Sequence, residues 1–412
     1  MTQYSLIKKL EILSDAAKYD ASCASSGTTK RNSADGKGLG STEGHGICHA
    51  YAPDGRCISL LKILMTNFCI YDCVFCVNRA SSNVERARFT VEEVVALTLD
   101  FYRRNYIEGL FLSSGIIKSS DKTMEDMVRI VRELRTTHQF RGYIHLKTIP
   151  DASQELITEA GLYADRLSIN IEFPSDTSLK TLAPEKDILS IKQAMAGIRS
   201  SIQDAREPTL VSKWQKVFAP AGQSTQMIVG ADQSNDETVL QRSASLYGSY
   251  KLKRVYYSAF SPIPDASKFL PLVKPPLMRE HRLYQADWLM RFYGFGVGEI
   301  LDSSDSGMLD LAIDPKLAWA LKNRQFFPLD VNRASKELLL RVPGFGTKTV
   351  TRLLQARRST NLRYEDMVRM GATMSKAKAF VMLQDWHPGK LTDDHTLRSK
   401  FAPPAEQLQL FA

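Results

Sequence analysis

Three cysteines stand close together in the chain, at Cys69, Cys73 and Cys76, directly after an apolar segment. The C-x3-C-x2-C spacing brings three thiols into one short loop, and thiolates are the ligands that iron–sulfur clusters take. A four-iron cluster held by three thiolates keeps one iron free for another ligand. The loop therefore predicts a [4Fe-4S] cluster with an open iron, which is what a catalytic cluster needs.

Two other uses of these cysteines fit the sequence less well. Structural zinc sites usually pair two C-x2-C or C-x2-H units, and the chain has no second unit of either kind. A disulfide is disfavoured because the N-terminus shows no secretory signal: Lys8 and Lys9 interrupt its apolar residues. No stretch approaches the roughly 18 apolar residues of a membrane span, so we expect a soluble, cytoplasmic protein without membrane contact.

An aromatic residue, Phe75, stands directly before the last cysteine. With it, the loop resembles that of the radical S-adenosylmethionine (SAM) superfamily, in which three cysteines bind three irons and SAM chelates the fourth. The resemblance covers about residues 58–300 and implies a [4Fe-4S] cluster and S-adenosyl-L-methionine as cofactors. It also implies reductive cleavage of the cofactor and hydrogen abstraction by a 5′-deoxyadenosyl radical.

Short apolar runs alternate with amphipathic stretches from Ile58 onward, which predicts an α/β fold. The predicted strands cover Ile58–Thr66, Gly109–Ser113, Tyr143–Lys147, Arg166–Ile171, Gln226–Ala231 and Arg254–Phe260. The predicted helices cover Val91–Arg104, Met124–Thr136, Ser153–Gly161, Ile188–Asp204, Asp236–Tyr250 and Met278–Tyr293. Strict alternation gives a parallel sheet with right-handed crossovers. Curled, this sheet is a partial (β/α)6 TIM-type barrel, the fold that the resemblance also implies.

The carboxyl ends of barrel strands gather at one end, where chemistry takes place. The candidates there for binding the cofactor are Phe75, Ser113, Ser114, Gly115, Lys147, Asn170, Glu172, Val229 and Gly230.

The resemblance suggests a role for each of these groups. The backbone of Ser113–Gly115 would hold the cofactor's amino group, although the acidic residue usual in the family is absent there. Lys147 suits the carboxylate, and an exposed lysine at the barrel rim would look the same. Asn170 and Glu172 lie on one side of a strand and suit ribose hydroxyls. Val229-Gly230 suits adenine, and a buried core strand would have the same sequence.

All six cysteines precede residue 77, and three of them, Cys23, Cys48 and Cys57, lie outside the cluster loop. These three suit a second metal centre or pack as small buried thiols; their spacing matches no known metal pattern. Residues 1–57 are expected to form an N-terminal helix followed by a Gly- and Ser-rich loop that covers the active site.

The excess positive charge of the chain lies near its C-terminus. Of a net charge of +9, residues 322–400 hold 16 Lys and Arg against 7 Asp and Glu, so the rest is neutral. In this segment Pro-Gly-Phe-Gly stands in the turn Val342–Lys348, between two predicted helices, and resembles the helix-hairpin-helix motif of DNA-binding proteins. Helix N–H groups and cations there suit phosphates rather than bases. The DNA-binding candidates are Gly344, Gly346, Lys348, Arg352 and Arg357; a purely structural αα-hairpin is the alternative.

Residues 401–412 are expected to form a mobile tail. Within it, Gln407, Leu408, Leu410 and Phe411 match the bacterial sliding-clamp-binding peptide Gln-Leu-x-Leu-Phe, unless the tail docks on its own domain. The predicted domains are the N-terminal segment 1–57, a radical SAM barrel at 58–300, a linker at 301–321, a basic helix-hairpin-helix domain at 322–400 and the tail at 401–412.

Taken with Lys18-Tyr19-Asp20, Cys23–Gly27 and the loop through Arg79, the chain is similar to a radical SAM family associated with DNA modification or repair. Genes of that family are associated with the gene of a uracil-DNA-glycosylase-like protein. The similarity therefore implies three partners: the glycosylase-like protein, DNA and an electron donor. Three other functions stay open: a small-molecule radical enzyme resembling biotin synthase, an RNA-modifying radical enzyme, and a DNA-binding scaffold with a redox-sensing cluster. The sequence identifies no catalytic side chain.

Overall fold

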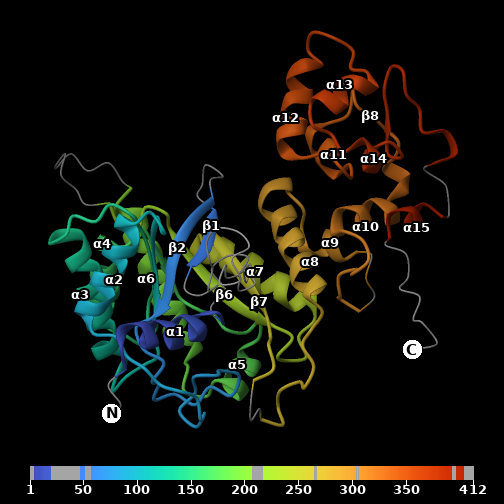
Figure 1. Ribbon diagram of the computed structural model, residues 1–412. Helices are drawn as coiled ribbons and strands as arrows, with labels where there is room; N and C mark the ends of the chain where they lie inside the picture. The colour runs from blue at the N-terminus through green and yellow to red at the C-terminus, as the bar shows by residue number, and fades with distance from the viewer. Residues whose placement is uncertain are drawn as a thin grey trace, which may run out of the picture. The chain divides into compact units, whose positions relative to one another are not determined.

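The structure is a computed structural model that describes residues 4–19, 47–51, 57–206, 217–263, 267–302, 304, 306–391 and 396–402. The chain divides into two compact units, shown in Figure 1. Unit 1 consists of Met1–Gln233 and Ser245–Pro275, and unit 2 consists of Ser234–Ala244 and Pro276–Ala412. Among the described residues, no helix is both long and apolar enough to cross a bilayer.

Unit 1 is built on a seven-stranded sheet whose spatial order follows the chain. Its strands are β1 (Ile47–Tyr51), β2 (Cys57–Leu64), β3 (Gly109–Ser113), β4 (Tyr143–Lys147), β5 (Arg166–Ser168), β6 (Gln223–Val229) and β7 (Arg254–Ala259). Strands β2 to β7 pair in parallel, which confirms the predicted partial barrel.

Strand β1 was not predicted, because it lies in the segment that we expected to be a loop. It pairs antiparallel with β2, from Ile47 opposite Leu61 to Tyr51 opposite Cys57. Its sequence, Ile-Cys-His-Ala-Tyr, lacks a clear alternation of apolar and polar residues. The strand forms at the free edge of β2, where unpaired backbone groups are available.

The helices of unit 1 lie between the strands along the chain. They are α1 (Leu6–Ala17), α2 (Val91–Arg103), α3 (Ser120–Thr136), α4 (Gln154–Tyr163), α5 (Asp176–Leu182) and α6 (Ile188–Asp204); α7 (Asp236–Tyr250) spans the unit boundary. Helix α2 begins at the predicted capping box, in which the N–H of Glu93 donates to Thr90 Oγ1 at 3.2 Å. Helix α5 is additional to the prediction.

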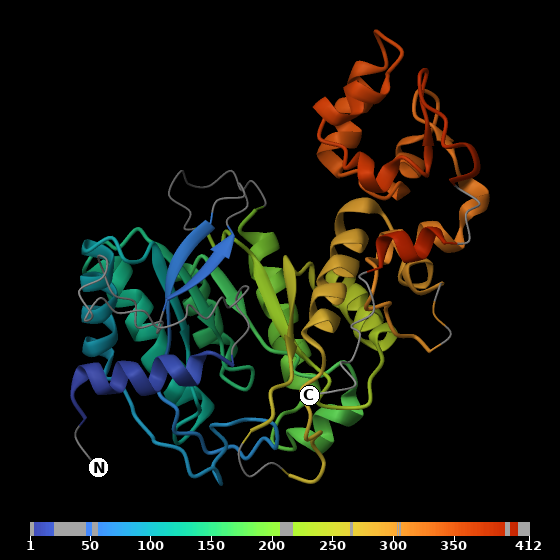
Figure 2. The same ribbon diagram turned by 45° about the vertical axis from the view of Figure 1, so that its right-hand side comes forward.

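The ends of the parallel strands determine where a site can form. Strands β3 and β6 are buried along their whole length, so their side chains fill the interior. In Figures 1 and 2 the loops after β2 and β7 leave the sheet at the end where α5 lies. This is the carboxyl end of the strands, where we expected the chemistry to take place.

Unit 2 consists mainly of helices, with two short paired strands, β8 (Leu329–Asp330) and β9 (Val381–Met382). Its helices are α8 (Leu277–Trp288), η1 (Leu289–Tyr293), α9 (Val297–Leu301), α10 (Pro315–Lys322), η2 (Arg324–Phe326), α11 (Lys336–Arg341), α12 (Thr347–Ala356), α13 (Tyr364–Arg369), α14 (Met374–Ala377), η3 (Gly389–Leu391) and α15 (Leu397–Phe401).

The unit boundary differs from the predicted barrel at 58–300 and linker at 301–321. The stretch Met278–Tyr293, predicted as the last barrel helix, corresponds to α8 and η1 of unit 2, and the predicted linker contains most of α10. Within unit 2, Arg279 of α8 donates from Nε to the fully buried carboxylate of Asp236 at 2.7 Å, so α8 is tied to the start of α7 by a buried ion pair.

The predicted turn between two helices is present between α11 and α12. Gly344 has φ +84°, and an added Cβ would lie 2.5 Å from the carbonyl oxygen of Thr373. Only glycine fits this position without strain. The N–H of Thr373 donates to the carbonyl of Gly344 at 3.0 Å, so the turn is held against the segment between α13 and α14.

Candidate active site

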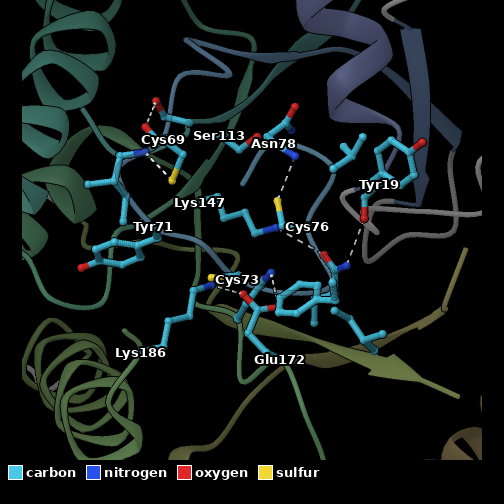
Figure 3. Close-up of a pocket in the computed structure, with 18 of the residues that line it drawn as sticks. Tyr19, Cys69, Tyr71, Cys73, Cys76, Asn78, Ser113, Lys147, Glu172 and Lys186 are labelled. Atoms are coloured by element: carbon cyan, nitrogen blue, oxygen red, sulfur yellow. Dashed lines mark hydrogen bonds and ion pairs between the residues drawn. The ribbon is translucent and has the colours of Figure 1, made fainter. Parts of the chain in front are cut away.

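A pocket of about 210 Å³ lies at the carboxyl end of the unit 1 sheet (Figure 3). The predicted site residues that line it are Cys69, Phe75, Cys73, Cys76, Ser113, Ser114, Gly115, Lys147, Asn170 and Glu172. Four segments of the chain, separated by up to about a hundred residues, thus meet where the strand ends converge. Val229 and Gly230 do not line the pocket; Gln226 and Ile228 do, since side chains alternate along β6.

The three cysteines surround the pocket from one loop. Figure 3 shows the sulfurs of Cys69, Cys73 and Cys76 at separate positions around the pocket. Among the described residues, no three His, Cys, Asp or Glu side chains are placed to hold one metal ion. Ligands spread around a shared space suit a cluster in which each thiolate binds a different iron better than they suit one zinc ion.

Burial controls the protonation of these thiols. It raises the pKa of Cys73 to about 12 and that of Cys76 to about 11, so both are protonated near neutral pH until a metal replaces the proton. Backbone N–H groups already face two of the sulfurs: Asn78 N–H donates to Cys76 Sγ at 3.4 Å, and Ile116 N–H to Cys69 Sγ at 3.5 Å. Such bonds stabilise negative charge on sulfur.

Arg86, which the sequence analysis did not identify, holds both ends of the cysteine loop. Its Nη1 donates to the carbonyls of Asn67 and, at 2.9 Å, Asn78; its Nη2 donates to those of Arg79 at 2.6 Å and Ser82 at 3.0 Å. The first carbonyl precedes Cys69 and the others follow Cys76. The planar guanidinium fork can satisfy four carbonyls at once, so Arg86 fixes the loop's shape.

Gly115 brings the end of β3 against the cysteine loop. Its N–H donates to the carbonyl of Thr66 at 2.8 Å, and an added Cβ would lie 2.3 Å from the carbonyl oxygen of Phe68. The cysteine loop therefore occupies the space that a side chain at this position would need. Next to it, Ile70 N–H donates to the carbonyl of Ile116 at 2.9 Å.

Glu172 and Lys186 form a buried ion pair on the other side of the pocket. The Lys186 ammonium donates to the carboxylate of Glu172, which is 3% exposed and has a left-handed backbone with φ +63°. Burial alone would lower the pKa of Lys186, but the Glu172 carboxylate and the Cys73 thiol raise it above its ordinary value. Lys186 therefore carries a positive charge beside the thiols.

Three other polar side chains of the pocket form long hydrogen bonds, to one another or to the backbone. Lys147 Nζ donates to Gln226 Oε1 at 3.3 Å, and Gln226 Nε2 donates to the carbonyl of Tyr19 at 3.2 Å. Asn170 Nδ2 donates to Glu172 Oε2 at 3.3 Å, whereas the buried Oδ1 of Asn170 has no partner. A buried acceptor of this kind requires a donor, and a hydroxyl of a bound ligand would supply one.

The other predicted residues lie outside this pocket. Cys48 is buried against Ile58, Leu60 and Phe111, which suits a small packing thiol. Cys23 and the side chain of Cys57 lie outside the described residues, as does the tail with its predicted clamp-binding peptide, so the second metal centre stays a prediction.

The predicted DNA-binding residues lie around α12 in unit 2. Lys348 and Arg352 are exposed, and Gly344 and Gly346 form the turn. Arg352 also donates from Nη1 to the carbonyl of Met370 at 3.2 Å. Arg357 differs in being half-buried, and its Nη1 donates to the carbonyls of Val331 at 3.1 Å and Ala334 at 2.7 Å. The Arg357 guanidinium is therefore engaged within the unit more fully than that of Arg352.

Comparison with known proteins concerns the first of these two regions. Residues 63–204 match the model of the Radical SAM superfamily. A search of curated proteins found no match. Solved structures similar to the chain include the FeFe-hydrogenase maturase HydG from Carboxydothermus hydrogenoformans, with 13% identity, a TM-score of 0.42, and 55% of this chain and 50% of that chain covered.

Two further structures show a similar degree of resemblance. Methylornithine synthase (PylB) has 15% identity and a TM-score of 0.41, with 54% of this chain and 60% of that chain covered. Coproporphyrinogen III oxidase (HemN) from Escherichia coli, described as a radical SAM enzyme, has 13% identity and a TM-score of 0.34, with 62% and 56% covered. This chain thus spans less than two thirds of the length of each of these structures.

The pocket residues fit the two groups that radical SAM enzymes use, a [4Fe-4S] cluster and SAM. Three thiols surround the space for a cluster. The unpartnered Oδ1 of Asn170 and the Glu172 carboxylate offer acceptors for hydroxyls, and Lys147 offers a cation for a carboxylate. Cys69, Cys73 and Cys76 would hold the cluster.

Proposed function

We propose that this chain is a radical SAM enzyme that acts on DNA in modification or repair; the match of residues 63–204 to the Radical SAM superfamily supports the first part of this proposal. Its cofactors are a [4Fe-4S] cluster and S-adenosyl-L-methionine, as in other enzymes with this domain. When bound, these groups supply a 5′-deoxyadenosyl radical for hydrogen abstraction. The observation that carries the DNA assignment is the basic helical turn of unit 2.

The pocket residues have separable tasks in this function. Arg86 and Gly115 shape the cysteine loop, and Lys186 places a positive charge beside the thiols. Asn170 and Glu172 would orient the cofactor's ribose, and Lys147 its carboxylate. Tyr71, whose hydroxyl donates to Asp151 Oδ2 at 3.1 Å, joins the cysteine loop to the segment after β4 and helps to close the pocket to water.

The support for DNA comes from charge and local structure in unit 2. Residues 322–400 carry the whole +9 net charge of the chain. Lys348 and Arg352 are exposed on α12, directly after the Gly344–Gly346 turn. Backbone N–H groups at a helix start together with nearby cations bind phosphates without reading the base sequence. We therefore expect affinity for the DNA backbone rather than for a sequence.

The salt dependence of binding tests this assignment. The logarithm of the affinity falls linearly with that of the salt concentration, by about 0.9 for each phosphate contact. Replacing Lys348 and Arg352 by alanine should weaken binding to all duplexes alike and reduce the slope by about 2. The control is Arg103→Ala with Arg104→Ala, which removes the same charge from exposed positions in unit 1. Equal slopes in both variants would contradict the assignment of α12.

The substrate class is tested by product release. We expect 5′-deoxyadenosine formation by the reconstituted enzyme to be stimulated by DNA more than by transfer RNA. Stimulation by transfer RNA alone would favour an RNA-modifying enzyme. If neither nucleic acid changed the rate of 5′-deoxyadenosine formation, a small-molecule substrate would be favoured. Binding of DNA without any 5′-deoxyadenosine would favour a redox-sensing scaffold.

The proposal includes partners and a location. We expect a uracil-DNA-glycosylase-like protein to act with the enzyme, an electron donor to reduce the cluster, and the protein to be cytoplasmic. A sliding clamp would bind Gln407, Leu408, Leu410 and Phe411 with a Kd of about 1 μM to 1 mM. Titration of a labelled peptide 401–412 tests the clamp, and binding that survives Leu410→Ala with Phe411→Ala would exclude this motif.

A further inference from the structure

A second cavity, of about 530 Å³, lies within unit 2 beside the Gly344–Gly346 turn. Its aromatic lining consists of Tyr284, Trp288, Tyr293 and Phe345. Its charged lining consists of Asp314, Lys316 and Lys376. The volume falls in the range of cavities that hold small organic groups, about 300–1,000 Å³. None of the functions described so far uses this cavity.

Trp288 presents a large aromatic surface in a fixed orientation. It lines the cavity and is nevertheless 50% exposed. The ring of Phe292 lies 4.4 Å from it, and the guanidinium of Arg291 lies 5.7 Å from Trp288 and 4.7 Å from Phe292. Arg291 is in turn paired with the buried carboxylate of Asp287 at 3.2 Å. An exposed indole held by such contacts is prepared to stack on a flat ligand.

Two lysine amines and one carboxylate form the charged part of the cavity wall. Lys316 is 8% exposed, donates to the carbonyl of Phe345 at 2.7 Å and lies 4.6 Å from the ring of Tyr293. Lys376 is paired with Asp314 at 2.9 Å. Burial lowers the pKa of Lys316 to about 7, so its amine is only partly charged at neutral pH. Lys316 also anchors the turn to the cavity wall, because its partner is the middle residue of the Gly344–Gly346 turn.

We propose that this cavity binds an unstacked nucleobase of a DNA strand whose phosphates contact the Gly344–Gly346 turn. The inference rests on the proposed function and adds a substrate preference to it. Aromatic walls stack on any base, and the cations attract the strand that carries it. An apolar peptide would place apolar side chains against the polar lining formed by Asp314, Lys316 and Lys376. DNA with an unpaired or extruded base should therefore bind better than a continuous duplex.

The test compares two DNAs with the full chain. One is a short continuous duplex, and the other is the same duplex with one unpaired 2-aminopurine, whose fluorescence is quenched on stacking. Wild-type protein should bind the second more tightly and quench it. Trp288→Ala should lose about 5- to 150-fold of affinity for the unpaired DNA, as expected for one lost base–aromatic stack, with the continuous duplex unaffected.

Two variants serve as controls. Trp288→Phe keeps an aromatic ring and should retain most of the affinity and the quenching. Phe326→Ala removes an aromatic side chain of unit 2 that is 46% exposed and does not line the cavity, and it should change neither.

The outcomes separate this inference from the proposed function. The nucleobase site would be overturned if Trp288→Ala lost equal affinity for both DNAs, or if it lost no affinity and the wild type quenched no fluorescence. It would also be overturned if only RNA with an unpaired base bound more tightly through Trp288, or if an apolar peptide displaced the unpaired base. Loss of DNA binding in Lys348→Ala with Arg352→Ala would in each case leave the proposed function standing.

Discussion

Replacement of Arg86 by methionine should release the cysteine loop while the barrel stays folded. Arg86 donates to four carbonyls on both sides of the cysteines. A hydrogen bond to a charged group contributes about 1.5–3 kcal/mol, but four bonds from one guanidinium are not additive, and water can replace some of them in a partly exposed loop. We therefore expect the free energy of opening of the cysteine loop to fall by about 2–4 kcal/mol, which raises the equilibrium constant for opening about 30- to 1,000-fold.

Hydrogen exchange measures this opening directly. In the apo protein, amides of residues 67–82, including Ala80 N–H bonded to the carbonyl of Tyr71 at 2.8 Å, should exchange faster in Arg86→Met. After anaerobic reconstitution, the variant should hold less iron and lose it faster in air. Arg86→Lys should fall between the two proteins, because an ammonium keeps the charge but cannot reach four carbonyls as a planar fork does.

The control for Arg86 is Arg88, two residues further along the chain. Arg88 forms a surface ion pair with Asp126 at 2.9 Å, and its side chain is 46% exposed. Surface pairs contribute about 0–1 kcal/mol, so Arg88→Met should leave loop exchange and iron content unchanged. If Arg86→Met exchanged its loop amides at the wild-type rate and bound full iron, our account of the loop would be refuted.

Three further predictions follow from the structure. Gly115→Ala places a Cβ 2.3 Å from the carbonyl oxygen of Phe68, so it should lower the free energy of unfolding by about 1–3 kcal/mol and reduce the iron content. Gly248→Ala, which has open space around it, should change neither. Lys186→Met leaves the Glu172 carboxylate buried without its cation, so the free energy of unfolding of the apo protein, measured by thermal unfolding, should fall by about 3–5 kcal/mol. Adding Glu172→Gln to the same chain should restore part of that free energy. Burial lowers the pKa of Lys316 from 10.5 to about 7, so the unfolded chain binds more protons between these values. The free energy of unfolding of the wild type, relative to that of Lys316→Met, should therefore rise with pH across that window, by at most about 1.4 kcal/mol per pH unit. Urea unfolding at several pH values measures this slope, and a decrease with pH would contradict a cost of burying the charged lysine.

The parts of the site that the sequence predicted are those fixed by local pattern. The spacing of Cys69, Cys73 and Cys76 carries their chemistry within eight residues. The predicted strand Arg166–Ile171 ends at Ser168, so Asn170 and Glu172 reach the pocket from the segment after β5 and not through alternation along a strand. In β6, by contrast, side chains do alternate between faces. The same alternation explains the shift from Val229 to Ile228, because one residue along a strand reverses the face. Periodicity of apolar residues was likewise enough for the parallel barrel.

The parts that the sequence did not predict depend on contacts between distant segments. Strand β1 forms because β2 has a free edge, and within unit 2 Arg279 of α8 meets Asp236, 43 residues away. Lys186 meets Glu172 only after α5 has turned the chain back to the pocket. No spacing rule connects these residues, and a lysine or arginine in a helical or loop sequence usually indicates only an exposed surface.

The two cations that the sequence analysis did not identify explain how three thiols can become thiolates in a buried loop. Burial raises the pKa of Cys73 and Cys76 and so opposes their negative form. Lys186 beside the thiols and Arg86 at the ends of the loop both lower the electrostatic cost of that form. Because Glu172 and the loop carbonyls hold these cations in place, the positive charge is present before the iron arrives. The loop is thus prepared for an anionic ligand set by residues whose side chains need not touch the metal.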